Sequence, residues 1–336
     1  MIGIGQQYSS AWSRRIVAVF GILSGILIGS CISGSAWAQA AADTSASLVT
    51  PWSSLTGARV TTQPNPVFSR PPSAPLPGYL QWIAPTAVAA RNSFFYVLDG
   101  GRQQIFRYDT MREVMTPFAD YPASAVRAMA VAPDLSLYVA DANARKVLHF
   151  APDGRLLRSF ADDLNLGLPV AVLFDEPTGR LLVADSLYNQ VLIFNSLGQT
   201  VRALKSDETR SVEAMAAGPD GLYLVDRLGR QIVVIDRQGE DRYFFGEETL
   251  HDPNAIAVDR FNRVFVSDSF DNTIKVYEQG HMIATINGKG ASPPFFNRVT
   301  GLWLEHDLLY VADSLNNRIR TFKIAPPGAK GSSRAE

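Results

Sequence analysis

The sequence has one cysteine, four histidines and almost equal numbers of acidic and basic residues. Cys31 is the only cysteine in 336 residues, so the chain cannot form an internal disulfide and must be stabilised by packing alone. Its 31 Lys and Arg are balanced by 32 Asp and Glu, which is not the basic excess of a nucleic-acid-binding protein. We therefore expect no nucleic acid partner.

Motifs for common catalytic chemistries are also missing. The sequence has no Gly-x-Ser-x-Gly nucleophile elbow and no phosphate-binding loop. No stretch after Ala40 shows the 3.6-residue apolar period of a helix. The sequence therefore predicts a chain without helices in its folded domain, with no catalytic residues, no metal site and no cofactor.

What the sequence does have is one unit repeated six times. Each copy contains an apolar run that ends in aspartate, and these aspartates are separated by 42, 44, 41, 42 and 45 residues. They are Asp99, Asp141, Asp185, Asp226, Asp268 and Asp313. A period near 40 residues is typical of solenoids, propellers and other repeat arrays.

The second copy illustrates the content of one period. Residues 128–132, 137–141, 147–150 and 156–160 are short β-prone runs separated by turns such as Pro152-Asp-Gly154. The runs are nearly continuous in apolar residues, so both faces of each sheet should be buried, as they are between propeller blades. We predict an all-β, six-bladed β-propeller of four-stranded blades.

The repeats resemble the NHL repeat. Asp313-Ser-Leu-Asn-Asn-Arg-Ile319, Asp268-Ser-Phe-Asp-Asn-Thr-Ile274 and Asp185-Ser-Leu-Tyr-Asn-Gln-Val191 match its pattern closely. In the other three copies the Asn four residues after the aspartate is replaced by Arg145, Arg230 and Gln103. The resemblance covers residues 79–325 and implies the propeller fold more firmly than any function. We expect the repeated Asp to accept hydrogen bonds from turn amides, and the Asn four residues later to adopt the left-handed conformation of a tight hairpin.

The N-terminal 38 residues predict a targeting segment. Arg14-Arg15 precedes an uncharged, largely apolar stretch that ends in Ala36-Trp-Ala38, as in a secretory signal peptide cleaved before Gln39. Two alternatives are a lipobox at Ile28-Gly-Ser-Cys31, which would make Cys31 the lipidated first residue, and an uncleaved membrane anchor. All three interpretations predict an exported domain, periplasmic, secreted or attached to the envelope.

The segments that flank the repeats differ from them in composition. Residues 39–78 form a linker with seven prolines between Pro51 and Pro77, and residues 326–336 form a polar tail expected to be disordered. The sixth copy lacks a fourth strand. We expect the N-terminal side to supply it, from residues 79–83 or 58–62.

Two groups of candidate binding residues follow from the predicted fold. The first lines the central channel at the start of each innermost strand: Thr86, Arg127, Val170, Glu213, Asn254 and Thr300. We expect Arg127 and Glu213 to pair across it. The second lies on hairpins that share one face: Arg102, Arg145, Lys146, Tyr188, Arg227, Arg230, Phe270 and Arg318. Arginine and aromatic residues are favoured at interface hot spots.

Comparison with six-bladed enzymes suggests an alternative. Lactonases of the gluconolactonase type hold a divalent cation in the channel, and Glu213 and Asn254 could supply two ligands, although Arg127 would oppose the cation. Peptide-amidating lyases use histidine-bound zinc, but only His251 is expected near the channel mouth. We expect a binding or scaffolding module for a protein, peptide or glycan in the cell envelope, with Arg102, Arg145, Arg230 and Arg318 as anchors; the alternative is a channel-mouth lyase or lactonase, with or without a metal.

Overall fold

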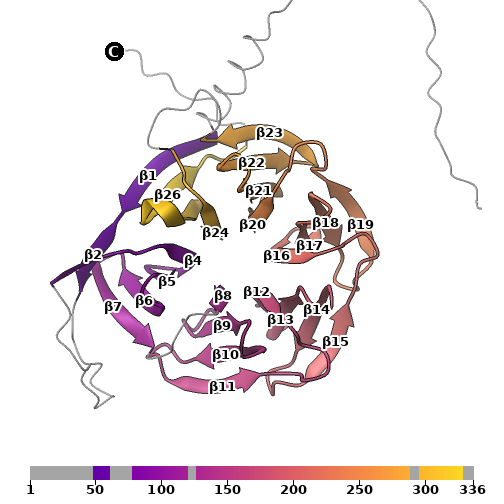
Figure 1. The fold of residues 1–336 in the computed structure, drawn as a ribbon, viewed down its shortest axis with the longest axis horizontal. Coiled ribbons are helices and arrows are strands. Elements are labelled where there is room, and N and C mark those ends of the chain that lie inside the picture. The colour runs from indigo at the N-terminus through magenta and orange to yellow at the C-terminus, as the bar shows by residue number, and fades with distance from the viewer. Residues whose placement is uncertain (1–47, 61–77, 120–125, 288–294, 328–336) are drawn as a thin grey trace, which may run out of the picture.

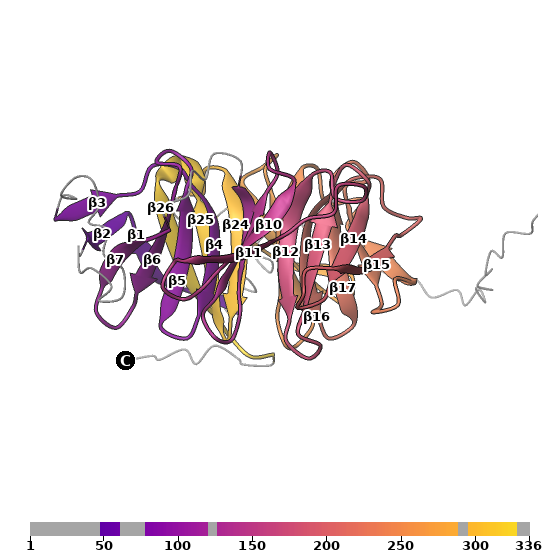
Figure 2. The same ribbon diagram turned by 90° about the horizontal axis from the view of Figure 1, so that it is seen from below.

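The computed structural model describes residues 48–60, 78–119, 126–287 and 295–327, which form six sheets around a central axis (Figure 1). Five sheets have four strands and one has six. Figure 2 shows the ring edge-on as a flat disc. The prediction of a six-bladed all-β propeller is confirmed. The predicted targeting segment and Cys31 lie outside the described residues.

The blades follow one another along the chain, each with its first strand next to the axis. Blade one has β4 (Pro85–Arg91), β5 (Phe94–Asp99), β6 (Gln104–Asp109) and β7 (Val114–Ala119); blade two has β8 (Val126–Val131), β9 (Leu137–Asp141), β10 (Lys146–Phe150) and β11 (Leu156–Phe160); blade three has β12 (Pro169–Asp175), β13 (Arg180–Asp185), β14 (Gln190–Phe194) and β15 (Thr200–Leu204). Blade four has β16 (Val212–Gly218), β17 (Gly221–Asp226), β18 (Gln231–Ile235) and β19 (Asp241–Phe245). Blade five has β20 (Pro253–Val258), β21 (Arg263–Asp268), β22 (Thr273–Glu278) and β23 (His281–Ile286). Blade six has β24 (Val299–Glu305), β25 (Leu308–Asp313) and β26 (Arg318–Ile324), and the one short helix in the described ranges, η1 (Ser314–Asn316), lies between the last two. No helix in these ranges is long and apolar enough to span a membrane.

The core is divided among the interfaces between neighbouring blades. The middle strands β9, β14 and β18 are buried at every position, because each side of a blade faces another blade. Between blades three and four, for example, Leu182 and Val191 pack with Leu224 and Val233 in one cluster. The continuous apolar runs in the sequence therefore reflect strands that are covered on both faces.

The repeated aspartates lie at the end of the second strand of each blade and are almost completely buried. In blade four, Asp226 accepts hydrogen bonds from the amides of Arg210 and Ser211 in the incoming linker, at 3.1 and 3.0 Å, and from the amide of Gly229 in the following hairpin, at 3.1 Å. The prediction of turn-amide acceptors is confirmed. The carboxylate also binds the linker, so that one side chain joins the two segments.

The residue four positions after each aspartate adopts the predicted left-handed conformation. Its φ lies between 51° and 56° in all six copies: Gln103, Arg145, Asn189, Arg230, Asn272 and Asn317. Where this residue is asparagine, its side-chain oxygen accepts a hydrogen bond from the amide that leads into the next blade. The amide donors are Val212, Arg298 and Ala84, at 3.1, 2.7 and 2.8 Å.

The ring is closed by a strand from the N-terminal side, but not by either expected segment. Strand β1 (Val49–Leu55) pairs antiparallel with β26 and completes blade six, and Ser53 and Thr321 share a side-chain hydrogen bond of 2.6 Å. The two expected segments instead extend blade one, where β2 (Gly57–Val60) pairs in parallel with β7 and β3 (Tyr79–Gln81) pairs with β2. The prediction of residues 79–83 or 58–62 as the closing strand was wrong. Strand β1 lies on the outside and five of its seven residues are exposed. Its sequence therefore lacks the apolar pattern by which the other strands were predicted.

We expect a shortened chain that begins at Thr56 to unfold at a temperature several degrees lower than one that begins at Leu48. Loss of β1 leaves the edge of β26 unpaired and uncovers the side of Phe322 and Ile324, and an exposed edge also promotes self-association. Thermal unfolding and size-exclusion chromatography would measure both effects. Equal melting temperatures and monomeric elution of the two chains would contradict this role for β1.

Candidate functional site

A β-bulge occurs at the same place in every innermost strand. The strand pairing skips one residue near the start of each, and the skipped residues are Thr86, Arg127, Val170, Glu213, Asn254 and Thr300. These are the six residues predicted to form the channel ring, and all six line one central cavity. A bulge redirects the side chain of the unpaired residue, which explains how a strand that packs between blades also presents a side chain to the channel.

The central cavity, called the cup below, extends from the second-to-third-strand hairpins at its mouth, where Gly101 and Arg227 line it, along the innermost strands to Leu304. Its volume is about 1190 Å³. Trp303 of β24 lies three residues deeper than the ring residue Thr300 and packs against the cores of the six–one, one–two and two–three interfaces. This contact with several blades means that the indole reaches across the axis and narrows the cup at its deep end.

An arginine that the ring prediction did not include organises the acidic side of the cup. Arg227 lies on the blade-four hairpin, and its Nε is 2.8 Å from Asp252 while Nη1 is 3.8 Å from Glu213. The hydrogen bond to Asp252 raises the pKa of the Arg227 guanidinium. The expected pair between Arg127 and Glu213 is therefore replaced by an Arg227–Glu213 contact from within blade four.

Two other arginines of the cup have no side-chain partner within the described ranges. Arg127 projects from the bulge of β8, and Arg298 lies just before β24 with φ of 61°; both are exposed and both line the cavity. Arg298 makes hydrogen bonds through its backbone, where its amide donates to the Asn272 side chain and its carbonyl accepts from the amide of Ser314. The cup thus has two uncompensated guanidinium groups and one that is shared by two carboxylates.

The ring does not fit a hard divalent cation. Asn254 donates from Nδ2 to the carbonyl of Val299 at 2.6 Å, and its Oδ1 accepts from the Ser267 hydroxyl at 2.7 Å. The amide oxygen of Asn254 is thereby engaged in a partly buried hydrogen bond, and Glu213 lies beside the guanidinium of Arg227. Calcium normally takes six to eight oxygen ligands, and no group of three or more His, Cys, Asp or Glu that could hold a metal occurs among the described residues.

The four histidines are far apart in the fold. His149 lies on β10, stacked on Tyr138 at 4.2 Å, and burial lowers its pKa. His281 begins β23 and His306 occupies the β24–β25 turn. Only His251 lies at the mouth face, where it stacks on Phe270 at 4.8 Å. The described chain therefore brings no three imidazoles together for a zinc ion.

Three of the four arginines proposed as hairpin anchors make contacts within the propeller. Arg102 donates to the carbonyl of Gln81, and Arg145 donates to the carbonyls of Leu166 and Asp163 in the linker to blade three. Arg318 is 8% exposed and bonds Asp313 and the carbonyl of Phe295. Arg230 is exposed, with no side-chain partner in the described chain.

Comparison of the blades explains the position of Arg318. It occupies the place held by Gln190 and Gln231 in blades three and four, five residues after the repeated aspartate. Both glutamines also donate to a linker carbonyl, at 2.7 and 3.0 Å. Arg318 thus performs the same structural task as a neutral glutamine and has little surface to offer a partner.

The hairpin face also carries an apolar arc that includes three residues the sequence interpretation missed. The residue two positions after the repeated aspartate is a large, exposed hydrophobic side chain in four consecutive blades: Leu187 (61% exposed), Leu228 (69%), Phe270 (71%) and Leu315 (54%). Blades one and two have Gly101 and Asn143 there. Only Phe270 belonged to the predicted set. Alignment of this hairpin position would have found the rest, because large hydrophobic residues in a predicted turn are unusual.

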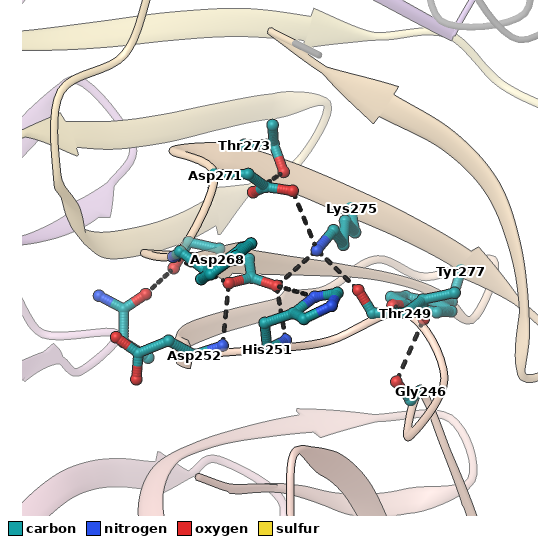
Figure 3. Close-up of polar contacts among 12 residues, drawn as sticks. Gly246, Thr249, His251, Asp252, Asp268, Asp271, Thr273, Lys275 and Tyr277 are labelled. Carbon is teal, nitrogen blue, oxygen red and sulfur yellow. Dashed lines mark hydrogen bonds and ion pairs between the residues drawn. The ribbon is translucent and has the colours of Figure 1, made fainter. Parts of the chain in front are cut away.

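Next to Phe270, Asp268 is the centre of the most extensive of these hairpin networks (Figure 3). Its carboxylate accepts from the amides of His251 and Asp252 at 2.9 and 3.0 Å, and lies 2.5 Å from Lys275 Nζ. Burial favours a higher pKa for Asp268, but the hydrogen bonds from Lys275 and the amides outweigh it and the pKa is lowered. Lys275 also donates to the carbonyl of Thr249 at 2.7 Å. This buried pair joins the hairpin that presents Phe270 to the linker that carries His251.

No known protein-family model and no curated protein matches this sequence. Solved structures do match it. Virginiamycin B lyase from Staphylococcus aureus is 12% identical, with a TM-score of 0.56 over 72% of this chain and 95% of that chain. A protein of unknown function from Bacteroides thetaiotaomicron is 17% identical, with a TM-score of 0.61 over 73% and 70%. The hydrazine synthase of Kuenenia stuttgartiensis is 12% identical, with a TM-score of 0.55 over 73% and 96%. At these identities the similarity concerns the fold.

We expect Lys275→Met to destabilise the protein by about 3 kcal/mol, because it leaves the carboxylate of Asp268 charged and buried without its cation. Asp268→Asn combined with Lys275→Met should recover part of that loss, since the uncompensated charge is gone. Denaturant unfolding would measure both. Lys323→Met is the control, because Lys323 lies 3.8 Å from Asp307 with half of its side chain exposed. A loss of less than about 0.5 kcal/mol for Lys275→Met would show that the buried Asp268–Lys275 pair does not stabilise the fold.

Proposed function

We propose that this chain is an exported propeller of the NHL type that serves as a binding or scaffolding module in a bacterial cell envelope. Its partner, a protein, peptide or glycan, would dock on the hairpin face over the open end of the cup. The observation that carries the proposal is the apolar arc of Leu187, Leu228, Phe270 and Leu315. Four neighbouring blades expose a large apolar residue at one equivalent hairpin position.

The energetic cost of the arc supports a binding role. Each of its side chains is more than half exposed, and apolar surface in water costs about 25 cal/mol per Å² relative to a buried state. A turn is ordinarily polar, and the corresponding sites of the first two blades are glycine and asparagine. Clusters of exposed apolar side chains with a polar rim are typical of interaction sites.

Two features of the sequence support the NHL type and the location. The Asp-Ser-x-x-Asn pattern of the third, fifth and sixth copies resembles the NHL repeat, and its Asn makes the inter-blade hydrogen bonds described above. The apolar stretch after Arg14-Arg15 has the composition of an export signal. Whether the mature N-terminus is free, lipidated on Cys31 or an uncleaved anchor determines only how the propeller is attached.

We expect the triple variant Leu187→Ser, Leu228→Ser and Phe270→Ser to lose capture of envelope partners by the immobilised protein while keeping its melting temperature. The replaced side chains are exposed, so their loss affects a partner more than the fold. The matched control is Leu197→Ser with Val201→Ser, which removes apolar residues 73% and 48% exposed at the outer edge of blade three. Equal capture by the triple variant, the control and the unaltered protein would exclude the arc as the docking surface.

The alternative proposal is a channel-mouth lyase or lactonase. Virginiamycin B lyase has a similar fold, and one solved structure is a catalytically inactive histidine-to-alanine variant of it with quinupristin. In this chain, Glu213 inside the cup and His251 at its mouth are the groups that could accept a proton, and Arg227 could stabilise a developing anion.

An enzyme of this kind should cleave a cyclic ester of the streptogramin or sugar-lactone class, and Glu213→Gln and His251→Ala should each reduce the rate at least about a hundredfold, the usual contribution of an acid–base group. Chromatography of the products would measure it. His281→Ala is the control, because His281 lies at a turn on the opposite face. If the unaltered protein cleaves none of these esters above the uncatalysed rate, the binding proposal is favoured.

A further inference from the structure

The charged groups of the cup are divided between its two sides. Glu213, Asp252 and Arg227 lie on blades four and five, where the two carboxylates share one guanidinium. Arg127 and Arg298 come from blade two and from the linker into blade six, which flank blade one (Figure 1). The side formed by blades six, one and two is therefore cationic, whereas the opposite side is close to neutral or slightly acidic.

Blade one provides space between these two arginines. Its hairpin begins with Gly100 and Gly101, both of which line the cup, so no side chain projects where blades three to six carry leucine or phenylalanine. A methyl group added to Gly101 would come within 2.3 Å of the Ile83 side chain, and one added to Gly100 within 2.9 Å of Thr86. The close approach of the backbone excludes larger residues at both positions, which keeps the cup open on this side.

The remaining groups on the cationic side are hydroxyls and one apolar residue. Thr86 and Thr300 are the ring residues of blades one and six, and their hydroxyls are only weakly engaged, 3.5 and 3.4 Å from backbone carbonyls. Leu315, 54% exposed, lines the cup on the blade-six hairpin. An oxyanion between the guanidinium groups would have hydroxyl donors below it and an apolar side chain beside it.

We propose that the cup binds an oxyanionic group, a carboxylate or a phosphate, between Arg127 and Arg298 in front of blade one, with an adjoining apolar part of the ligand against Leu315. This inference rests on the proposed function, because the anion is the part of the partner that enters the cup. Guanidinium groups bind carboxylate and phosphate oxygens through paired hydrogen bonds. Both guanidinium groups are exposed, so added salt screens their attraction to an anion.

The arrangement also predicts which ligands are rejected. A cationic group in front of blade one would face two unpaired guanidinium groups, and a neutral amide would leave both without a countercharge. The charge of a ligand should therefore affect its affinity for the cup more than its shape does. On the opposite side of the cup, the shared guanidinium of Arg227 leaves no comparable site for an anion.

The experiment is a calorimetric titration of the full-length protein with 4-phenylbutyrate, its neutral amide 4-phenylbutyramide, and inorganic phosphate. We expect the carboxylate to bind more tightly than the amide, and Arg127→Gln and Arg298→Gln each to weaken carboxylate binding about tenfold or more, which corresponds to at least about 1.4 kcal/mol. Arg230→Gln is the matched control, because Arg230 is exposed on the same face but does not line the cup. Added salt should weaken the binding.

The arms of the titration separate the outcomes. Binding of phosphate alone with the same dependence on both arginines would support an oxyanion site and assign it to phosphate esters. Equal binding of the acid and the amide, unchanged binding in Arg127→Gln and Arg298→Gln, or no binding of any probe at millimolar concentration would overturn the inference. The proposed docking surface fails separately, if the triple variant of the apolar arc still captures its partner.

Discussion

The fold depends on a buried carboxylate that joins two segments of each blade. The chain enters a blade through a linker that runs over the hairpin face, and the second strand later returns to that face. The repeated aspartate is placed where the two meet, and it accepts amide hydrogen bonds from both, as Asp226 does from Ser211 and Gly229. A carboxylate is suited to this position because it has two oxygens that can each accept several donors. A neutral residue of the same size would leave some of these buried amides unsatisfied.

The groups that balance the charge of this buried carboxylate differ among blades one, four, five and six. In blades five and six the countercharge is an internal Lys275 or Arg318, and in blade four Gln231 donates a neutral hydrogen bond at 3.3 Å. Asp99 in blade one has Arg102 at 3.5 Å and a pKa raised by burial, despite amide hydrogen bonds from Ile83 and Arg102. The hairpin cations therefore belong largely to the architecture, and only those without such a task are free to meet a ligand.

The repeats made the fold predictable from sequence, because the aspartate period, the left-handed position and the bulged ring residue recur in every copy. The closing strand was not predictable for the opposite reason. Strand β1 belongs to no repeat, contains Pro51 and is mostly exposed. Residues 79–83 have a more strand-like sequence and were therefore wrongly predicted to close the ring. Its pairing with β26 follows from where the N-terminal segment lies in space, which a local pattern does not encode.

The candidate site was predictable in its positions but not in its charge pairing. Alignment of the copies placed Arg127, Glu213 and Asn254 in one ring, and the bulges confirm that placement. It did not reveal that Arg227, a hairpin residue outside the ring, lies within reach of Glu213, nor that Asn254 directs its oxygen to Ser267. These contacts depend on side-chain length and on the neighbouring blade. They also determine the chemistry: because Arg227 occupies the acidic side, the unpaired positive charge of the cup remains with Arg127 and Arg298, beside the one blade whose hairpin has no side chain to fill the space.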